Sequence, residues 1–433
     1  MTDVDIAVKF FFQLAVILAS CRLFGWLGRR FLGQTQVVME MLAGVLLGPS
    51  LFGMLFPQVQ AWLFPTEKIL IEGVKTSHPS MAVLYVASQV GLVIYMFLVG
   101  LEFDVDLLKQ KAKGALGVSI SGIALPFSLG VLVAYWMTKD STYFTSGVSP
   151  WEGALFLGAA MCITAFPMLA RIIYERGLSG TTMGTLALAA GASDDALAWA
   201  MLAIVLASFK GNAMIAVMAI GGGAVFAIAM ATVGKKLLVN LEKWTIREGR
   251  ITPPIATVTF MILMMAAWFT DAIGIYAVFG AFVLGACMPR GKFANEMQMR
   301  MEHATGSLLL PIFFVYSGLN TKIQLIGTGS TLWITILVIA FAILGKWGGC
   351  TLAARASGES WRASHSIGVL MNARGLMELI ILNIGLQQGV ITPTLYTVMV
   401  LMAIITTLMA SPIFVWINRK EPYGVKVAVE GAS

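Results

Sequence analysis

The feature that most constrains the fold of this chain is a series of long apolar stretches. About 13 of them follow one another along the 433 residues, and most could cross the roughly 30 Å hydrocarbon core of a bilayer as a helix. Charged residues make up only 12% of the chain, whereas soluble domains carry about 25%. The sequence therefore predicts an all-α polytopic membrane protein and argues against a soluble enzyme. The expected spans are 6–28, 35–56, 81–101, 114–137, 151–173, 181–209, 212–234, 251–270, 272–289, 304–320, 329–354, 363–388 and 393–418.

The distribution of lysine and arginine agrees with this set of spans. With the N-terminus outside, 21 of the 29 basic residues fall on the inner side and 6 on the outer side, as the positive-inside rule requires. The remaining two, Lys346 and Arg374, lie inside spans. We therefore expect a multi-pass protein of the cell (inner) membrane, with residues 419–433 as a short cytoplasmic tail.

Short segments recur between the two halves of the chain. Three pairs match: 43–48 (AGVLLG) with 280–285 (GAFVLG), 97–101 (FLVGL) with 315–319 (VYSGL), and 164–167 (TAFP) with 372–375 (NARG). Spans 1–6 thus pair with spans 8–13 across a single connector, so the second copy is inverted. The prediction is one membrane domain, 1–433, with a first inverted repeat at 6–209, a linker helix at 212–240 and a second repeat at 251–418. Inverted repeats with interrupted helices are typical of secondary transporters.

Two adjacent aspartates, Asp194 and Asp195, lie in the middle of the sixth span. A carboxylate at the bilayer centre costs several kcal/mol, so it is a functional candidate by default. Adjacent helix residues point about 100° apart, so one carboxylate can meet a basic partner while the other faces a water-filled cavity. The alternative is a purely structural ion pair. Ser193, which precedes the pair, is a secondary candidate.

The basic candidates inside spans are Lys346 and Arg374. Glycines on both sides of Lys346 allow close helix approach, although its long side chain could also snorkel to the inner surface. Arg374 has Glu378 four residues later, on the same helical face, and this pair could form a structural lock. Asn372, in the same segment, is a secondary candidate.

The fifth span is expected to break near Thr164, because Pro167 removes a backbone donor. Freed carbonyls and the Thr164 hydroxyl would be oxygen ligands for a small cation, and a plain proline kink is the alternative. The twelfth span can break in a similar way at Arg374 and Gly375. Two broken helices that cross would bring opposed helix ends to the midplane. A basic side chain there would neutralise the C-terminal ends, and a carboxylate the N-terminal ends.

These segments resemble the cation:proton antiporter superfamily, in particular its second family of monovalent cation/proton exchangers, which includes plant exchangers and bacterial relatives. The resemblance implies a homodimer, with spans 1–3 and 8–10 as a dimer domain and spans 4–6 and 11–13 as a core transport domain. It rests on 40–51 (EMLAGVLLGPSL), 163–172 (ITAFPMLARI), the paired aspartates, 311–318 (PIFFVYSG) and 371–385 (MNARGLMELIILNIG).

The resemblance also implies roles for single residues. Asp195 would carry the cation or the proton, and Asp194 can pair with Lys346. Thr164 would come from the unwound fifth helix, and Arg374 from the crossing of the twelfth helix.

The sequence therefore predicts a secondary antiporter, not an enzyme, that exchanges Na⁺ or K⁺ for H⁺ in monovalent cation and pH homeostasis. A proton and a cation would compete for Asp195, and movement of the core domain would expose the site to alternate sides. No cofactor and no nucleic-acid partner is expected. The main alternative is a sodium-coupled organic-anion symporter on a related fold. An intramembrane aspartyl protease is less favoured, because it would use aspartates from two separate helices.

Overall fold

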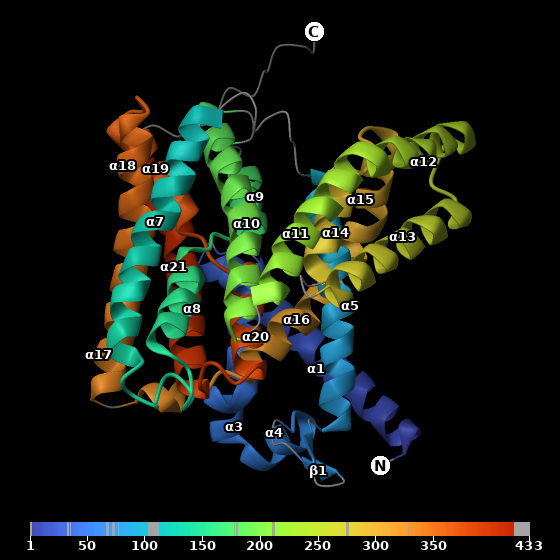
Figure 1. Ribbon diagram of the computed structural model, residues 1–433. Helices are drawn as coiled ribbons and strands as arrows, with labels where there is room; N and C mark the ends of the chain where they lie inside the picture. Colours follow the sequence, from blue (N-terminus) through green and yellow to red (C-terminus); the bar gives the residue numbers. More distant parts are fainter. Residues whose placement is uncertain are drawn as a thin grey trace. The chain divides into compact units, whose positions relative to one another are not determined.

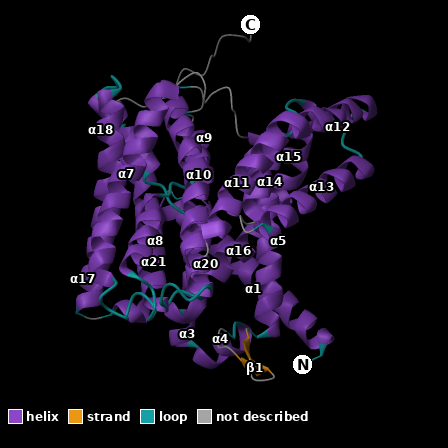
Figure 2. Ribbon diagram, in the orientation of Figure 1, coloured by secondary structure: helices purple, strands orange, loops and turns teal. Residues whose placement is uncertain are grey.

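The computed structural model describes residues 2–32, 34, 36–65, 69–71, 74–76, 78–102, 112–176, 178, 181–209, 213–273, 277–327 and 329–419. Within these residues the chain is almost entirely helical, apart from one short hairpin (Figure 1, Figure 2). In this hairpin β1 (Ile69–Ile71) pairs antiparallel with β2 (Val74–Thr76). The described residues contain 8 helical segments long and apolar enough to cross a membrane. The prediction of an all-α membrane protein is confirmed at this level.

The chain divides into two compact units, each built from three stretches of sequence. The first unit consists of Met1–Phe24, Glu40–Val105 and Trp199–Thr321, and the second of Gly25–Met39, Asp106–Ala198 and Lys322–Ser433. The helices of the first unit, some of which extend into the second, are α1 (Asp3–Leu27), α2 (Gln36–Val45), α3 (Phe52–Leu55), α4 (Pro57–Leu63), α5 (Pro79–Glu102), α11 (Ala213–Ala229), α12 (Lys235–Glu248), α13 (Pro253–Ala272), α14 (Ala277–Cys287), α15 (Lys292–Ala304) and α16 (Leu310–Leu319). Short π-helical turns of this unit lie at η2 (Leu46–Ser50), η3 (Met230–Gly234) and η4 (Thr305–Leu309), while η1 (Gly28–Leu32) belongs to the second unit.

Close approaches at glycines hold the first unit together. Gly48, in η2, lies against α16, and a Cβ added to it would be 3.1 Å from the carbonyl oxygen of Gly318. Gly285, in α14, lies against α5, and its added Cβ would be 3.0 Å from the Cα of Gly100. A side chain at Gly285 would also clash with the carbonyl oxygen of Phe97, whereas one at Gly48 would require its neighbour to shift by a few tenths of an ångström. The two contacts correspond to each other, because the matched segments pair Gly48 with Gly285 and Gly318 with Gly100.

Two amphipathic helices of the first unit continue beyond the apolar stretches read from the sequence. Helical structure runs from α11 through η3 into α12 and ends at Glu248, past the predicted end of the linker at 240. Similarly, α15 runs through η4 into α16. Both α12 and α15 alternate charged and apolar residues, so a search for long apolar stretches does not detect them.

The second unit contains two helices that are interrupted in the middle. Its helices are α7 (Ala112–Met137), α8 (Pro150–Cys162), α9 (Phe166–Glu175), α10 (Thr182–Phe209, up to Ala198), α17 (Ser330–Ile343), α18 (Gly349–Ala356), α19 (Trp361–Met371), α20 (Leu376–Gln387) and α21 (Pro393–Ile417), with the 3₁₀ turn η5 (Ile323–Ile326) and the π turn η6 (Leu344–Gly348). Residues 163–165 separate α8 from α9, and residues 372–375 separate α19 from α20. The predicted breaks near Thr164 and at Arg374 and Gly375 are therefore confirmed.

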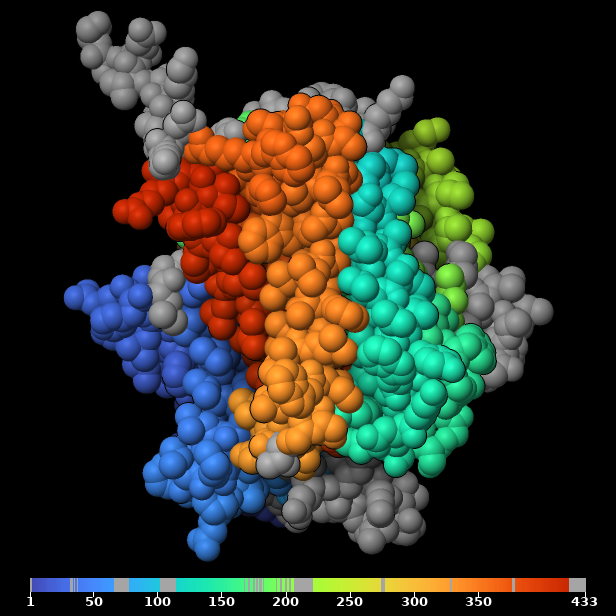
Figure 3. Space-filling view, turned by 90° about the vertical axis from the view of Figure 1, so that its left-hand side faces the viewer, coloured from blue at the N-terminus to red at the C-terminus, as the bar shows by residue number. Residues whose placement is uncertain are grey.

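The two interruptions are in direct contact. The backbone N–H of Ala165 donates a 3.1 Å hydrogen bond to the carbonyl oxygen of Ala373. Around them the second unit has a continuous apolar core, with buried side chains from α7, α9, α10, α18, α19 and α21. Figure 3 shows α7 side by side with the α17–α18 segment along one face of this unit. This packing fixes the polar groups of the crossing at the centre of the unit.

Candidate functional site

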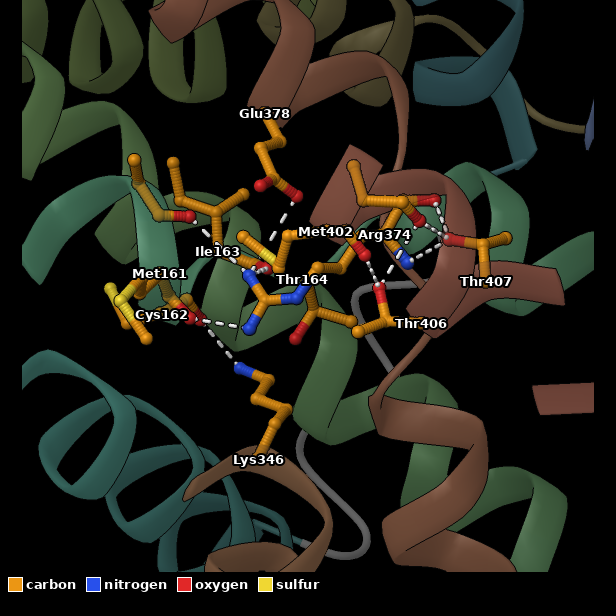
Figure 4. Close-up of polar contacts among 12 residues, drawn as sticks. Met161, Cys162, Ile163, Thr164, Lys346, Arg374, Glu378, Met402, Thr406 and Thr407 are labelled. Carbon is orange, nitrogen blue, oxygen red and sulfur yellow. Dashed lines mark hydrogen bonds and ion pairs between the residues drawn. The ribbon is translucent and has the colours of Figure 1, made fainter. Parts of the chain in front are cut away.

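Arg374 closes the C-terminal end of α8. Its Nη1 donates to the carbonyl oxygens of Ala160 and Ile163, both at 3.3 Å, and its Nη2 donates to that of Met161 at 2.5 Å (Figure 4). The last carbonyls of a helix have no intrahelical partner and carry the negative end of the helix dipole. A fully buried guanidinium thus neutralises this end, as predicted for a basic side chain at the crossing.

Thr407 of α21 fixes the backbone that carries this arginine. Its hydroxyl accepts a 2.9 Å hydrogen bond from the backbone N–H of Arg374 and donates one of 2.8 Å to the Arg374 carbonyl oxygen. The same hydroxyl lies 2.7 Å from the carbonyl oxygen of Ala403, one turn earlier in α21. The interrupted segment between α19 and α20 is thereby tied to a continuous helix.

Lys346 completes the neutralisation of α8 and forms an ion pair. Its Nζ donates to the carbonyl oxygen of Cys162 at 2.6 Å and lies 2.7 Å from Oδ2 of Asp194. Asp194 also accepts hydrogen bonds from the hydroxyls of Ser119, at 2.5 Å, and Thr164, at 2.6 Å. Both charged side chains are completely buried. Three donors therefore hold the Asp194 carboxylate, and the predicted pairing of Asp194 with Lys346 is confirmed.

Small residues bring Lys346 to this position. A Cβ added to Gly345 would lie 2.8 Å from the Cα of Pro126 in α7, and one added to Gly349 would lie 2.8 Å from the carbonyl oxygen of Ser121. The backbone of α7 therefore packs directly on η6. Single π turns inside α-helices occur frequently at functional sites because they redirect a side chain. Here the π turn contains Lys346 itself.

The carboxyl group of Glu378 approaches Arg374 without a hydrogen bond. Glu378 lies in the first turn of α20, and its Oε2 is 3.7 Å from Nη1 of Arg374. Both side chains are fully buried. Among the described residues neither carboxyl oxygen of Glu378 has a hydrogen-bond partner, nor has Nε of Arg374. The predicted (i, i+4) contact therefore exists, but as a loose charge contact.

The remaining predicted residues do not join the Asp194 cluster in the same way. The Ser193 hydroxyl donates to the carbonyl oxygen of Ala189 in its own helix, at 3.0 Å. Asn372 is buried at the end of α19, and its Oδ1 has no hydrogen-bond partner within the described part of the chain. The side chain of Asp195 lies outside the described residues.

Two residues of this site were not predicted from the sequence, namely Ser119 and Thr407. Each is a single hydroxyl residue in an apolar helix, and such residues commonly bond to their own helix. Their roles depend on partners 75 and 33 positions away in the chain. No local pattern marks them.

Comparison with known proteins identifies the family. A family model described as "Sodium/hydrogen exchanger, transmembrane" matches residues 10–420. The chain belongs to the sodium/hydrogen exchanger family. It is 39% identical over 407 residues to the Na(+)/H(+) antiporter NhaS4 of Synechocystis, an alignment that covers 93% of this chain and 95% of that protein. The resemblance to cation:proton antiporters is confirmed.

Relatives in plants and a solved archaeal structure extend this result. The chain is 36% identical over 408 residues to Cation/H(+) antiporter 17 of Arabidopsis thaliana, covering 93% of this chain but 47% of that protein. It thus spans about half the length of this plant relative. The sodium proton antiporter MjNhaP1 from Methanocaldococcus jannaschii has a similar fold, with a TM-score of 0.65 at 15% identity, covering 96% of this chain and 97% of the archaeal one.

Proposed function

We propose that this chain is a monovalent cation/proton antiporter that exchanges Na⁺ or K⁺ for H⁺. Family membership and the names of its relatives support this activity. The observation that carries the proposal is the fully buried pair of Asp194 and Lys346 at the crossing of two interrupted helices. Charges at this depth are costly, and in transporters they mark the ion pathway.

In this proposal Asp195 is the carboxylate that exchanges its occupant. Asp194 already has three donors and serves as the fixed partner of Lys346. Asp195 follows it in α10, and adjacent positions of a helix are rotated by about 100°. A proton or a cation at Asp195 would neutralise the carboxylate, so the two compete. Thr164, in the non-helical segment between α8 and α9, is the proposed source of further oxygen ligands for the cation. Asn372 Oδ1 is proposed as a second source.

The membrane architecture is part of the proposal. We propose about 13 transmembrane helices in a single membrane domain, 1–433, with inverted repeats at 6–209 and 251–418 around the linker at 212–240. The equivalent contacts of Gly48 with Gly318 and of Gly285 with Gly100 support this symmetry. The first compact unit contains most of spans 1 and 2 together with spans 3 and 8–10, and the second contains spans 4, 5 and 11–13 and most of span 6, which supports the division into dimer and core domains.

Transport would proceed by alternating access, with movement of the core domain exposing its site to either side in turn. We propose that the protein is a homodimer through the dimer domain and lies in the cell (inner) membrane. Its N-terminus is outside and its C-terminal tail is cytoplasmic, as the distribution of basic residues indicates.

The experiment that tests this function uses purified protein in liposomes with an imposed pH gradient. Addition of Na⁺ or K⁺ should dissipate the gradient in the wild type, and Asp195→Asn should abolish this response, because the proposed binding carboxylate is lost. Asp271→Asn, at an exposed position in α13, is the matched control and should behave as the wild type. Wild-type rates in Asp195→Asn would contradict the proposal.

A further inference from the structure

Two buried carboxyl groups of the second unit have opposite environments. Asp194 accepts from three donors, and one of them, Lys346, forms an ion pair with it at 2.7 Å. Glu378 is equally buried, yet its closest cationic atom is 3.7 Å away and neither of its oxygens has a hydrogen-bond partner among the described residues. Charge-assisted hydrogen bonds between nitrogen and a carboxylate are about 2.7–2.9 Å long. Asp194 therefore has the environment of an ionised carboxylate, and Glu378 does not.

The elements around Glu378 offer it little compensation. Helices α8 and α21 pack against α20. Helix α21 carries no charged residue, and its single titratable side chain, Tyr396, donates to Asn383 at 3.3 Å. In α8 the titratable residues are Glu152, in the first turn, and Cys162, at the end. The start of α20 favours a negative charge, but such a helix end does not replace the hydrogen bonds that a buried carboxylate needs.

Among the described residues, Arg374 is the charged side chain that lies nearest to Glu378. Its guanidinium already donates to the carbonyl oxygens of Ala160, Met161 and Ile163. Figure 4 shows Glu378 on one side of this guanidinium and Lys346 on the other. Lys346 in turn is engaged by Asp194 and by the end of α8. Because Arg374 and Lys346 donate to these other acceptors, Glu378 has no hydrogen-bond donor among the described residues.

We propose that Glu378 is a second proton-binding site of the core, separate from the aspartate pair and occupied by a proton in this conformation. When the proton leaves, the carboxylate attracts the guanidinium of Arg374. The guanidinium must then break some of its hydrogen bonds to the carbonyl oxygens at the end of α8. Carbonyl oxygens beside Thr164 become free for a cation. One proton goes to water, Arg374 keeps its charge, and the net charge of the core falls by one.

The proposal couples proton release at Glu378 to cation binding at the crossing. Coupling of this kind is reciprocal, so a bound cation must also promote loss of the Glu378 proton. The coupling between Glu378 and the cation rests on the proposed antiport. The protonation of Glu378 does not depend on it, and can be measured on purified protein without any transport.

Infrared spectroscopy of the purified protein tests the protonation directly. At neutral pH the wild type should show a carbonyl-stretch band of protonated carboxylic acid that Glu378→Gln lacks, while Asp195→Asn retains the Glu378 contribution. Glu302→Gln, at an exposed position in α15, is the control and should match the wild type in this band. Identical wild-type and Glu378→Gln spectra would overturn the proposal. Failure of Glu378→Gln to fold would also overturn it, because a neutral amide should replace a neutral acid.

Cation exchange at two pH values tests the coupling. The quantity to compare is the half-saturation concentration for Na⁺ or K⁺ in Glu378→Gln divided by that in the wild type. This ratio should be about fivefold or more higher at alkaline pH than at neutral pH. Glu302→Gln should follow the wild type at both. If the ratio of the half-saturation concentrations of Glu378→Gln and the wild type does not change with pH, Glu378 does not act on the cation site. Loss of exchange in the wild type would instead refute the antiport itself.

Discussion

A single carboxylate, that of Asp194, ties together four parts of the second unit. It stands on α10 and accepts from Ser119 of α7, Thr164 of the interruption after α8, and Lys346 of η6. Removal of one partner from a buried ion pair leaves an uncompensated charge, which costs more than the pair as a whole contributes. The pair therefore has a testable energetic signature.

Lys346→Met should destabilise the protein by about 3–5 kcal/mol, because Asp194 would remain buried without its counter-ion. Asp194→Asn should have a similar cost. The double variant should be more stable than the sum of the two single losses implies, since neither charge remains. Thermal unfolding of the purified proteins measures all three. Strictly additive losses would show that the two side chains are not coupled.

Ser119→Ala should cost less, about 1.5–3 kcal/mol, because it removes one hydrogen bond to a charged group while Thr164 and Lys346 remain. Ser128→Ala in the same helix is the matched control, since that exposed hydroxyl bonds to the Ala124 carbonyl of its own helix. The same unfolding assay compares them. An equal effect of the two substitutions would contradict the role given to Ser119.

At the scale of elements, the site depends on how closely α7 approaches η6. Gly345 faces the backbone of Pro126 at a distance that excludes a side chain, whereas a Cβ added to Gly348, in the same π turn, would have no neighbouring atom of the described residues within 4 Å. The two glycines therefore differ in packing although they are only three positions apart. This difference provides a matched pair of substitutions.

Gly345→Ala should destabilise the protein by about 1–3 kcal/mol, the usual cost of overpacking, and should move Lys346 away from Asp194. Gly348→Ala should be neutral or slightly stabilising, because alanine favours helix over glycine by about 1 kcal/mol. Unfolding temperatures, together with exchange rates in liposomes, distinguish the two. If Gly348→Ala lost stability and Gly345→Ala did not, the packing would be different from that described.

Elements also show what the sequence could and could not predict. Both interruptions were predictable, because Pro167 and Gly375 mark them, and so was the pairing of Asp194 with Lys346. The π turn at η6 was not, since it arises from packing against α7. Helices α12 and α15 were missed as well, because their charged faces hide them from a search for apolar stretches. Long-range hydroxyl contacts such as that of Ser119 have no local signal.

At the scale of the whole molecule, the central structural prediction is the number and direction of the crossings. The four native cysteines, Cys21, Cys162, Cys287 and Cys350, are all buried and none of them forms a disulfide, so an introduced cysteine can be labelled selectively. Lys139 lies after α7, and Arg247 lies near the end of α12. With the N-terminus outside, the proposed spans place these two positions on opposite sides of the membrane.

A thiol reagent that does not cross the membrane should therefore label Lys139→Cys in intact cells. Arg247→Cys should react only after the membrane is permeabilised. The wild-type chain serves as the background control. Labelling of both positions from the outside would refute the proposed topology, because it would require an even number of crossings between them.

The most direct test of the central claim, cation/proton antiport through the crossing, starts without any pH gradient. Proteoliposomes loaded with Na⁺ or K⁺ are diluted into medium without that cation, and the internal pH is followed. Antiport predicts that the outward cation gradient acidifies the interior, and that Asp195→Asn abolishes the change while Asp271→Asn does not. An internal pH that stays constant in folded wild-type protein, with either cation, would contradict the account.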